Sequence, residues 1–488
     1  MNIGEMLLFP VLFPLLAGIV AGLQKQEKRR NIWVLCVLVI ECISVLWLCQ
    51  DTASLTVWQM TPQTAIAYQA DSLAKFFACL ICIIWLLAGV FSFEYMKHEQ
   101  KPERFFMFYI MTLGALMSLC FAANAVTLYL SYEFMTILSL PLVLHTGTVE
   151  AVRAAMKYLG YSIFGAGLGL MGFFFLNSYC DTTAFVAGGS LNTFLASGNM
   201  VVLQIVYLLM MIGFGCKAGM FPLHAWLPTA HPVAPSPASA VLSGIITKGG
   251  VIAIIRVTFY MVGIDFIQGT WVQHTLLILA IITVFMGSML AYKEKLLKKR
   301  LAYSTVSQVS YVLFGLFLLH PIGFLGALMQ VVFHAIAKNI LFFGAGAIIY
   351  KTEKTFVYQY QGLGKEMPIV MWTFAIASLS LVGIPPVAGF VSKWYLAQAG
   401  LSPAYGAIGL VGVVVLMVSA LLTAGYLLPI VANAFFPGKS FDYSQIKKRE
   451  PNYYMTVPLI LLAIAIVALG LFPQGLINEI TKISNVIF

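Results

Sequence analysis

Charged side chains are scarce in this sequence. Only 9% of its 488 residues are Asp, Glu, Lys or Arg, whereas 61% are hydrophobic, and the mean hydropathy is +0.93. This composition excludes an ordinary soluble domain and indicates a membrane protein. The first apolar run has no basic leader before it, so we interpret it as a membrane span and not as a cleaved signal peptide.

The sequence also lacks the motifs of redox, zinc and phosphate chemistry. Its eight cysteines form a single CxxC, Cys79 and Cys82, which lies in an apolar run without further ligands and is best explained by packing. It contains no CxxCH haem motif, no phosphate-binding glycine loop and no plausible zinc cluster. We therefore expect no metal, no cofactor and no redox centre in this chain, which leaves open whether it is part of an enzyme.

Long apolar runs are abundant. A bilayer core of about 30 Å needs roughly 20 apolar helical residues, and about fourteen runs of that kind follow one another in a single membrane domain, 1–488. We predict an all-α polytopic protein. The predicted spans are 5–23, 32–50, 72–96, 105–122, 124–145, 155–178, 200–230, 236–261, 272–291, 301–319, 322–350, 367–399, 405–436 and 453–473.

Lys and Arg concentrate in alternate loops. Of the 28 basic residues, 21 lie in the loops 24–31, 97–104, 146–157, 293–300, 351–365 and 438–450. The intervening loops near 51–70, 179–199, 262–271 and 400–404 have none. By the positive-inside rule the basic loops face the cytoplasm, which predicts a cell-membrane protein with both termini outside. Membrane topology thus explains the net charge of +10, and we expect no nucleic-acid partner.

Several ionisable residues lie inside the apolar runs. Lys75 and Arg256 are near run ends, where a long side chain can snorkel to the interface. The deep residues are Lys217, Lys248, Lys338, Lys393, Glu133 and Glu41, with His334 four residues before Lys338 on one helix face. A charge at the bilayer centre costs several kcal/mol unless it is paired or hydrated. Any one of these residues could form a static ion pair, but the whole set indicates a proton relay.

Proline interrupts two of the runs. The runs 200–230 and 367–399 exceed the bilayer thickness, and Pro222 in one and Pro385 with Pro386 in the other lie near a deep lysine. We expect each helix to be broken there, as at ion sites of transporters, the alternative being a simple kink. The two broken segments also suggest an internal repeat. His224 and His231, beside these prolines, could assist proton uptake or only cap the turn.

Five segments carry a family resemblance: KAGMFPLHAWLPTAHPVAPSPASAVLSGIITKGGVIAIIR, SYEFMTILSLPLVLH, LAYSTVSQVSYV, HAIAKNILFFGAGAI and GIPPVAGFVSKW. They resemble the antiporter-like proton-conducting subunits shared by respiratory complex I, energy-converting membrane-bound hydrogenases and Mrp-type cation/proton antiporters. The resemblance covers about 70–430. It implies fourteen helices with two inverted five-helix repeats, spans 4–8 (105–261) and 9–13 (272–436), and broken helices at spans 7 and 12. Spans 1–3 (1–100) and a last span (453–473) flank the repeats.

The resemblance also implies roles for the deep residues. Glu133 and Lys217 would form a modulating ion pair, Lys248, His334 and Lys338 would form the central relay, and Lys393 would pass protons outward. In one complex I branch the last position is a glutamate, so a lysine argues against that branch. Glu41 has no counterpart in the family; we expect contact with a neighbouring subunit or an accessory role.

The expected function is that of a proton-translocating subunit in a redox-driven membrane complex, either an energy-converting hydrogenase or a complex I relative. Its partners would be other membrane subunits and a peripheral cytoplasmic redox arm containing iron–sulfur clusters and a nickel–iron site. The alternative is a subunit of an Mrp-type antiporter, which exchanges sodium ions for protons without redox chemistry. A purely structural scaffold is disfavoured because every relay position holds an ionisable residue.

Overall fold

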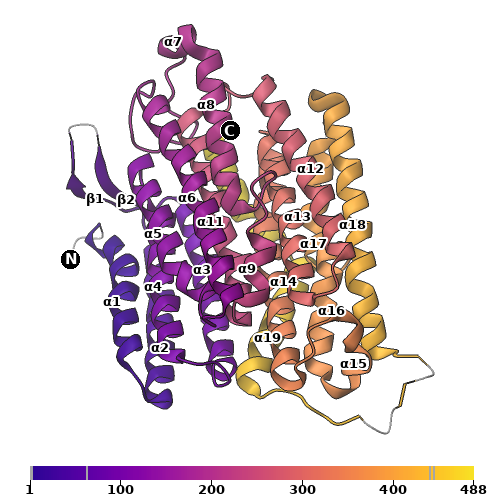
Figure 1. The fold of residues 1–488 in the computed structure, drawn as a ribbon. Coiled ribbons are helices and arrows are strands. Elements are labelled where there is room, and N and C mark those ends of the chain that lie inside the picture. The colour runs from indigo at the N-terminus through magenta and orange to yellow at the C-terminus, as the bar shows by residue number, and fades with distance from the viewer. Residues whose placement is uncertain (1–3, 62–63, 439–440, 443–445) are drawn as a thin grey trace.

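The computed structural model describes residues 4–61, 64–438, 441–442 and 446–488. Most of them form helices that run along one bundle (Figure 1). The first half contains η1 (Glu5–Leu8), α1 (Phe9–Leu23), α2 (Glu27–Leu48), α3 (Ser72–Tyr95), α4 (Pro102–Phe121), α5 (Ala125–Val143), α6 (Val149–Asn177), α7 (Thr193–Ala196), η2 (Ser197–Asn199), α8 (Met200–Ala218), α9 (Leu227–Val233), α10 (Ser236–Val241), η3 (Leu242–Ile246), α11 (Thr247–Ile255) and η4 (Arg256–Val262). The second half contains α12 (Trp271–Lys293), α13 (Leu297–Phe317), α14 (Pro321–Thr352), η5 (Val357–Tyr360), α15 (Leu363–Glu366), α16 (Pro368–Val382), α17 (Gly389–Gly400), η6 (Pro403–Tyr405), α18 (Gly406–Phe435), α19 (Tyr453–Leu471) and α20 (Gln474–Ile487).

The polytopic all-α prediction is confirmed. Twelve helical segments in the described part of the chain are long and apolar enough to cross a membrane. Two of the fourteen predicted spans are not among them. One is α13, which carries Lys298, Lys299 and Arg300 in its first turn, and the other is the pair α16 and α17, each of which is too short alone. The inverted repeats and the domain boundaries stay predictions.

Helix α14 lies at the centre of the bundle. Every residue from 323 to 348 is buried, because α14 packs against α3, α10, α13, α16, α17, α19 and α20. Helix α1, which packs on α4, lies at one flank, and α18, which packs on α12 and α16, lies at the opposite flank (Figure 1). Polar groups carried by α14 are therefore shielded from lipid.

Two helices are interrupted within the bundle. Helix α8 ends at Ala218 with Gly219 in the left-handed region (φ 81°), and α9 begins at Leu227. Helix α16 ends at Val382 with Gly383 at φ 92°, and α17 begins at Gly389. Glycine suits both ends because it adopts positive φ without a steric penalty. Pro222 lies in the first interruption, and Pro385 and Pro386 lie in the second.

Some elements were not foreseen from the sequence. Strands β1 (Ser54–Gln59) and β2 (Ala65–Gln69) form an antiparallel hairpin at one edge of the bundle (Figure 1). The tail forms α20, which packs on α14 and α3. The predicted span 236–261 contains two π-helical stretches, η3 and η4, which insert wider turns into that helix.

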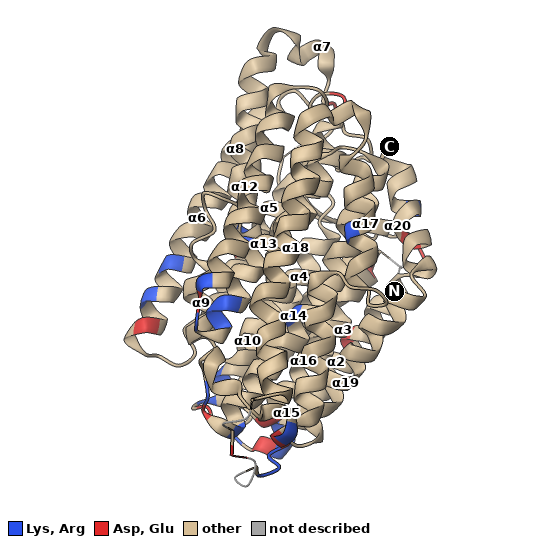
Figure 2. Cartoon of the chain, turned by 90° about the vertical axis from the view of Figure 1, so that its right-hand side faces the viewer, with Lys and Arg blue, Asp and Glu red and all other residues tan. Residues whose placement is uncertain are grey.

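Lys and Arg gather toward one end of the bundle, around α15 and the start of α6, and the opposite end near α7 shows almost none (Figure 2). The chain is an integral membrane protein with many spans, and this end is the one that the positive-inside rule assigns to the cytoplasm. The placement of both termini outside stays a prediction.

Candidate proton pathway

Lys217 is the first deep cation of the set, in the last turn of α8 before the interruption. Its side chain is fully buried, and Nζ donates hydrogen bonds to the hydroxyls of Thr136 (2.7 Å), Tyr158 (3.0 Å) and Ser162 (3.1 Å). Nζ also lies 4.6 Å from the centroid of the Tyr158 ring. Three neutral oxygens and an aromatic face therefore solvate this ammonium group in place of a carboxylate.

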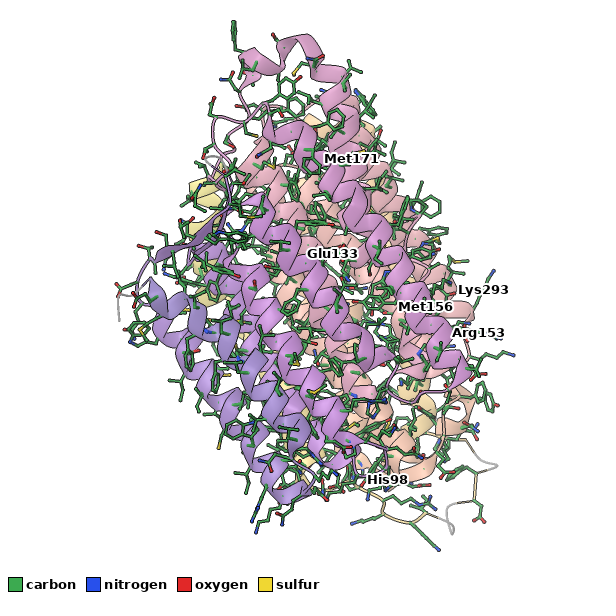
Figure 3. All side chains as sticks on the ribbon, turned by 60° about the vertical axis from the view of Figure 1, so that its left-hand side comes forward. His98, Glu133, Arg153, Met156, Met171 and Lys293 are labelled. Carbon is green, nitrogen blue, oxygen red and sulfur yellow. The ribbon has the colours of Figure 1, made fainter. Side chains whose placement is uncertain are left out.

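The expected ion pair between Glu133 and Lys217 is not formed. No such pair occurs among the described ion pairs within 4.0 Å. Glu133 is partly exposed on the outer face of α5, where its helical neighbours Leu130 and Ile137 are also exposed, at 44% and 56%. Figure 3 shows Glu133 about midway along the bundle. The residue of α5 that contacts Lys217 directly is Thr136, one turn after Glu133. The functional pairing of Glu133 with Lys217 stays a prediction.

Lys248 and His334 form the closest contact among the deep ionisable groups. Lys248 Nζ lies 2.6 Å from His334 Nδ1, although the two residues are on α11 and α14. Lys248 also donates to the Ser243 carbonyl at 3.1 Å, within the π-helical stretch η3. Two positive charges 2.6 Å apart would repel by about 6 kcal/mol at an effective dielectric constant of about 20. The pair can therefore share one proton but cannot hold a charge on both residues.

Lys338 lies one turn after His334 on α14 and is fully buried. Its Nζ donates to the carbonyl oxygen of Leu301 on α13 at 3.0 Å. Its partner is therefore a neutral backbone group, so the cation is not locked in an ion pair.

Lys393 lies at the second interruption. Its Nζ donates to the carbonyl oxygen of Leu381, one of the carbonyl groups at the end of α16 that has no intrahelical partner. The Tyr311 ring centroid is 5.5 Å from Nζ. The interrupted helix thus supplies the acceptor for this lysine.

Uncharged polar residues of α13, α14 and α17 form a hydrogen-bonded chain near the centre, and the sequence reasoning missed them. Gln330 Nε2, one turn before His334, donates to Gln308 Oε1 at 2.8 Å, and Ser392 donates to Gln330 Oε1 at 2.6 Å. Ser392 is adjacent to Lys393 in sequence. Two glutamines inside apolar runs were a visible signal, which a search for charged residues and histidines passes over.

The other candidate residues differ in their surroundings. His231 is fully buried, and its two ring nitrogens have no hydrogen-bond partner, while His224 is half-buried in the turn after Pro222. Glu41 is also fully buried, with both carboxylate oxygens unpartnered. Its side chain points into this chain and not to its outer surface, which favours the accessory role over the contact with a neighbouring subunit.

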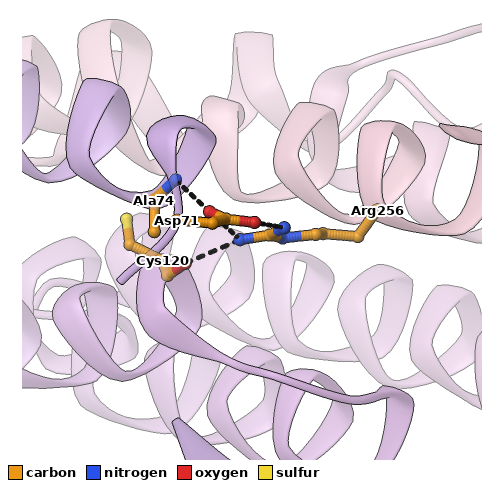
Figure 4. Close-up of polar contacts among 4 residues, drawn as sticks. All are labelled: Asp71, Ala74, Cys120 and Arg256. Atoms are coloured by element: carbon orange, nitrogen blue, oxygen red, sulfur yellow. Dashed lines mark hydrogen bonds and ion pairs between the residues drawn. The ribbon is translucent and has the colours of Figure 1, made fainter. Parts of the chain in front are cut away.

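Arg256 does not snorkel to the interface. It is 1% exposed and forms two hydrogen bonds with the carboxylate of Asp71, at 2.5 and 2.9 Å (Figure 4). Asp71 also accepts the Ala74 N–H at 2.8 Å as the N-cap of α3. This pair joins the start of α3 to η4 and lies apart from the lysine and histidine chain.

The described part of the chain contains no group of three or more His, Cys, Asp or Glu residues that could hold a metal ion. The chemistry that the deep residues can support is proton binding and release. Their hydrogen-bond partners are hydroxyls, amides and carbonyls, all of which orient protons or water.

Comparison with known proteins identifies the family. Residues 122–425 match the model described as "NADH:quinone oxidoreductase/Mrp antiporter, TM", and residues 59–106 match "NADH-Ubiquinone oxidoreductase (complex I), chain 5 N-terminus". All deep residues from Glu133 to Lys393 lie within the longer match.

Relatives come from both redox complexes and antiporters. NADH-quinone oxidoreductase subunit N of Desulforudis audaxviator is 30% identical, with coverage of 86% of this chain and 85% of the relative. Hydrogenase-4 component B of Escherichia coli is 30% identical over 86% of this chain, which spans 64% of that longer protein. A Na(+)/H(+) antiporter subunit of Bacillus subtilis is 29% identical, with coverage of 79% and 76%.

A solved structure shares the fold. A chain of the membrane-bound sulfane sulfur reductase, an archaeal respiratory membrane complex, superposes with a TM-score of 0.87 at 22% identity, covering 99% of this chain and 97% of that one. The extent of the family match, the 30% identity and the buried pathway together lead to one conclusion. The chain belongs to the family of antiporter-like, proton-translocating membrane subunits found in complex I, hydrogenases and Mrp antiporters.

Proposed function

We propose that this chain is the proton-translocating subunit of a redox-driven membrane complex of the energy-converting hydrogenase or complex I type. The observation that supports a relay most strongly is the 2.6 Å contact between Lys248 and His334 at the centre of the bundle. Because the pair can hold only one charge, a proton that arrives on one residue displaces a proton from the other.

Protons would move along the bundle in short steps. Lys217 lies beside α11, since a Cβ at Gly250 would be 3.1 Å from the Lys217 Cβ, so the hydroxyl cluster borders the helix of Lys248. From the Lys248 and His334 pair, with Lys338 one turn further along α14 as an additional proton-binding group, protons would pass by Gln330 and Ser392 toward Lys393 and leave on the outer side. Each acceptor on this path is neutral, which lets a lysine gain or lose its proton without breaking an ion pair.

Glu133 has a different role in this proposal. Its outward position on α5 makes it accessible to an adjacent membrane subunit. A cation of that subunit moving toward or away from Glu133 would change the electric field at Lys217, which contacts the inner face of the same helix through Thr136. The coupling would then be electrostatic and would act between subunits.

The energy source in this proposal lies in partner chains. We propose membrane subunits and a peripheral cytoplasmic arm as partners, with iron–sulfur clusters and a nickel–iron site in that arm. The named subunits of NADH-quinone oxidoreductase and Hydrogenase-4 support this assignment.

The second candidate function is sodium/proton antiport without redox chemistry. The Bacillus subtilis antiporter subunit, at 29% identity, favours it nearly as strongly. The native complex distinguishes the two. We would isolate it in mild detergent, identify its chains by mass spectrometry and measure bound iron and nickel. Stoichiometric metal with cluster-bearing chains supports the redox assignment, and a metal-free assembly of small membrane proteins contradicts it in favour of antiport.

A further inference from the structure

A cavity opens at the basic end of the bundle, away from the deep lysines. Its volume is about 210 Å³, and it lies between the loop that follows α3, the segment 232–235 and the start of α13. Glu99 and Lys298 line it, together with Thr146 and Thr355. Thr146 is exposed at the rim, whereas Lys298 is only 7% exposed at the base. The volume is sufficient for several water molecules, each of which takes about 30 Å³ in the liquid.

The two charged residues of the cavity face each other without contact. Among the described ion pairs within 4.0 Å, none joins Glu99 to Lys298. Lys298 Nζ instead donates to the carbonyl oxygens of Pro232, at 3.5 Å, and Ala234, at the end of α9. Burial raises the pKa of Glu99, an effect that the charges of Lys298 and His98 oppose. Glu99 can therefore exchange protons with water in the space between them.

His231 adjoins the cavity lining at Pro232 and packs against α14. It precedes Pro232, whose carbonyl accepts from Lys298, and both of its ring nitrogens lack a partner although the side chain is fully buried. A buried polar group without a partner is destabilising, so a purely structural ring is disfavoured. The ring stacks on Phe342 at 4.9 Å, four residues after Lys338 on α14. His231 thus lies between the cavity and Lys338.

Helix α13 also lies between the cavity and Lys338. Lys298, in its first turn, reaches the cavity, and Leu301, three residues later, accepts the hydrogen bond from Lys338. The cavity and the deep site are therefore about one helical turn apart along α13.

We propose that this cavity is the proton entrance of the chain on its basic side, with Glu99 as the collecting residue, Lys298 as the cation that faces it across the cavity, and His231 as the connection to Lys338. A proton from bulk water binds a carboxylate oxygen of Glu99 and moves through water in the cavity to one nitrogen of His231. His231 releases the proton from its other nitrogen toward Lys338, and a ring flip restores it. The inference rests on the proposed proton translocation and names its uptake site.

The test uses the native complex with its partner subunits, reconstituted in vesicles, and measures the rate of proton translocation. Glu99→Gln and Lys298→Met should each slow translocation about tenfold, below the ~10²- to 10⁴-fold of a direct proton-transfer group because water still reaches the cavity. Two control variants should keep the parent rate of translocation. Glu103→Gln changes a half-buried carboxylate that does not line the cavity, and Lys295→Met changes an exposed lysine in the loop before α13. Glu99→Asp should restore most of the rate, which a purely packing role would not do.

Two further measurements separate the possible failures. The complex with Thr355→Cys should translocate protons at the parent rate before labelling. A bulky thiol reagent added on the basic side should then label the cysteine, block the cavity and slow translocation. The rate before labelling shows that the variant is folded. If labelling and Glu99→Gln both leave the rate at the control level while Lys248→Ala abolishes translocation, the entrance is elsewhere and the relay stands. If Lys248→Ala also translocates at the parent rate, the proposed function itself fails.

Discussion

The substitution Asp71→Asn should destabilise the fold strongly, because it removes the anion that faces a buried guanidinium group (Figure 4). Arg256 is 1% exposed, and the loss of one partner of a buried pair costs about 3–5 kcal/mol. The Asp71 side chain is 22% exposed, so we expect the lower end, about 3 kcal/mol. Asparagine caps a helix nearly as well as aspartate, so the N-cap of α3 should survive and the loss should report the ion pair.

The assay is unfolding of the detergent-solubilised protein by SDS titration, followed by circular dichroism. Lys482→Gln is the matched control, since it breaks an exposed pair with Glu479 whose side chains are 68% and 64% exposed, and it should change the free energy of unfolding by about 0–1 kcal/mol. The double variant Asp71→Asn/Arg256→Met should recover most of the loss, because no buried charge remains. A single variant as stable as the control, or a double variant as unstable as the single one, would refute this reasoning.

Three other substitutions or treatments test separate parts of the structure. Gln330→Leu should slow proton translocation about tenfold or more without loss of assembly, because it removes the amide between the centre and Lys393, and vesicle assays with Gln330→Glu as the rescue variant check this. The sulfur atoms of Cys49 and Cys79 lie 3.3 Å apart, so a mild oxidant should cross-link them. Mass spectrometry of the intact chain should then show the loss of two hydrogens. If both cysteines still react with an alkylating reagent after oxidation, the packing of α2 on α3 is contradicted. Burial raises the pKa of Glu99, so the ionised carboxylate destabilises the fold above that pKa. The melting temperature of Glu99→Gln should therefore equal that of the parent at low pH and exceed it increasingly as the pH rises through the raised pKa. A melting-temperature gain that does not depend on pH would exclude this cause.

The sequence predicted the spans well because bilayer thickness sets their length. Hydropathy and alternating basic loops located the helices within a few residues, and the positions of Pro222 and Pro385 indicated the two interruptions. The prolines act locally, by removing a backbone donor and by clashing with the preceding turn, so their effect can be predicted without the tertiary structure.

The direction in which each side chain points from its helix could not be predicted in the same way. Lipid and protein interior are both apolar, so the hydrophobic periodicity that orients a helix in a soluble protein is weak in a membrane span. The partial exposure of Glu133 on α5 is therefore information that only the structure supplies. The partner of Arg256 was also missed, because Asp71 is 185 residues away in sequence and lies in what looked like a loop end.

The residues between the lysines needed the structure for another reason. Thr136, Tyr158 and Ser162 come from two helices, and nothing in their spacing shows that their hydroxyls meet at Lys217. The contact of Lys248 with His334 likewise joins residues 86 positions apart. The depth of a residue in the membrane can be estimated from its position in a predicted span. Which residues of different helices contact each other depends on how the helices pack.

The most direct test of the central claim measures proton translocation by the native complex with Lys248→Met in vesicles, alongside Lys295→Met as the surface control. Subunit content and the driving reaction of the partner chains are measured on the same preparations. The account predicts that Lys248→Met assembles normally and loses proton translocation, because His334 then has no partner with which to exchange a proton. An assembled Lys248→Met complex that translocates protons at the rate of the Lys295→Met control would contradict it.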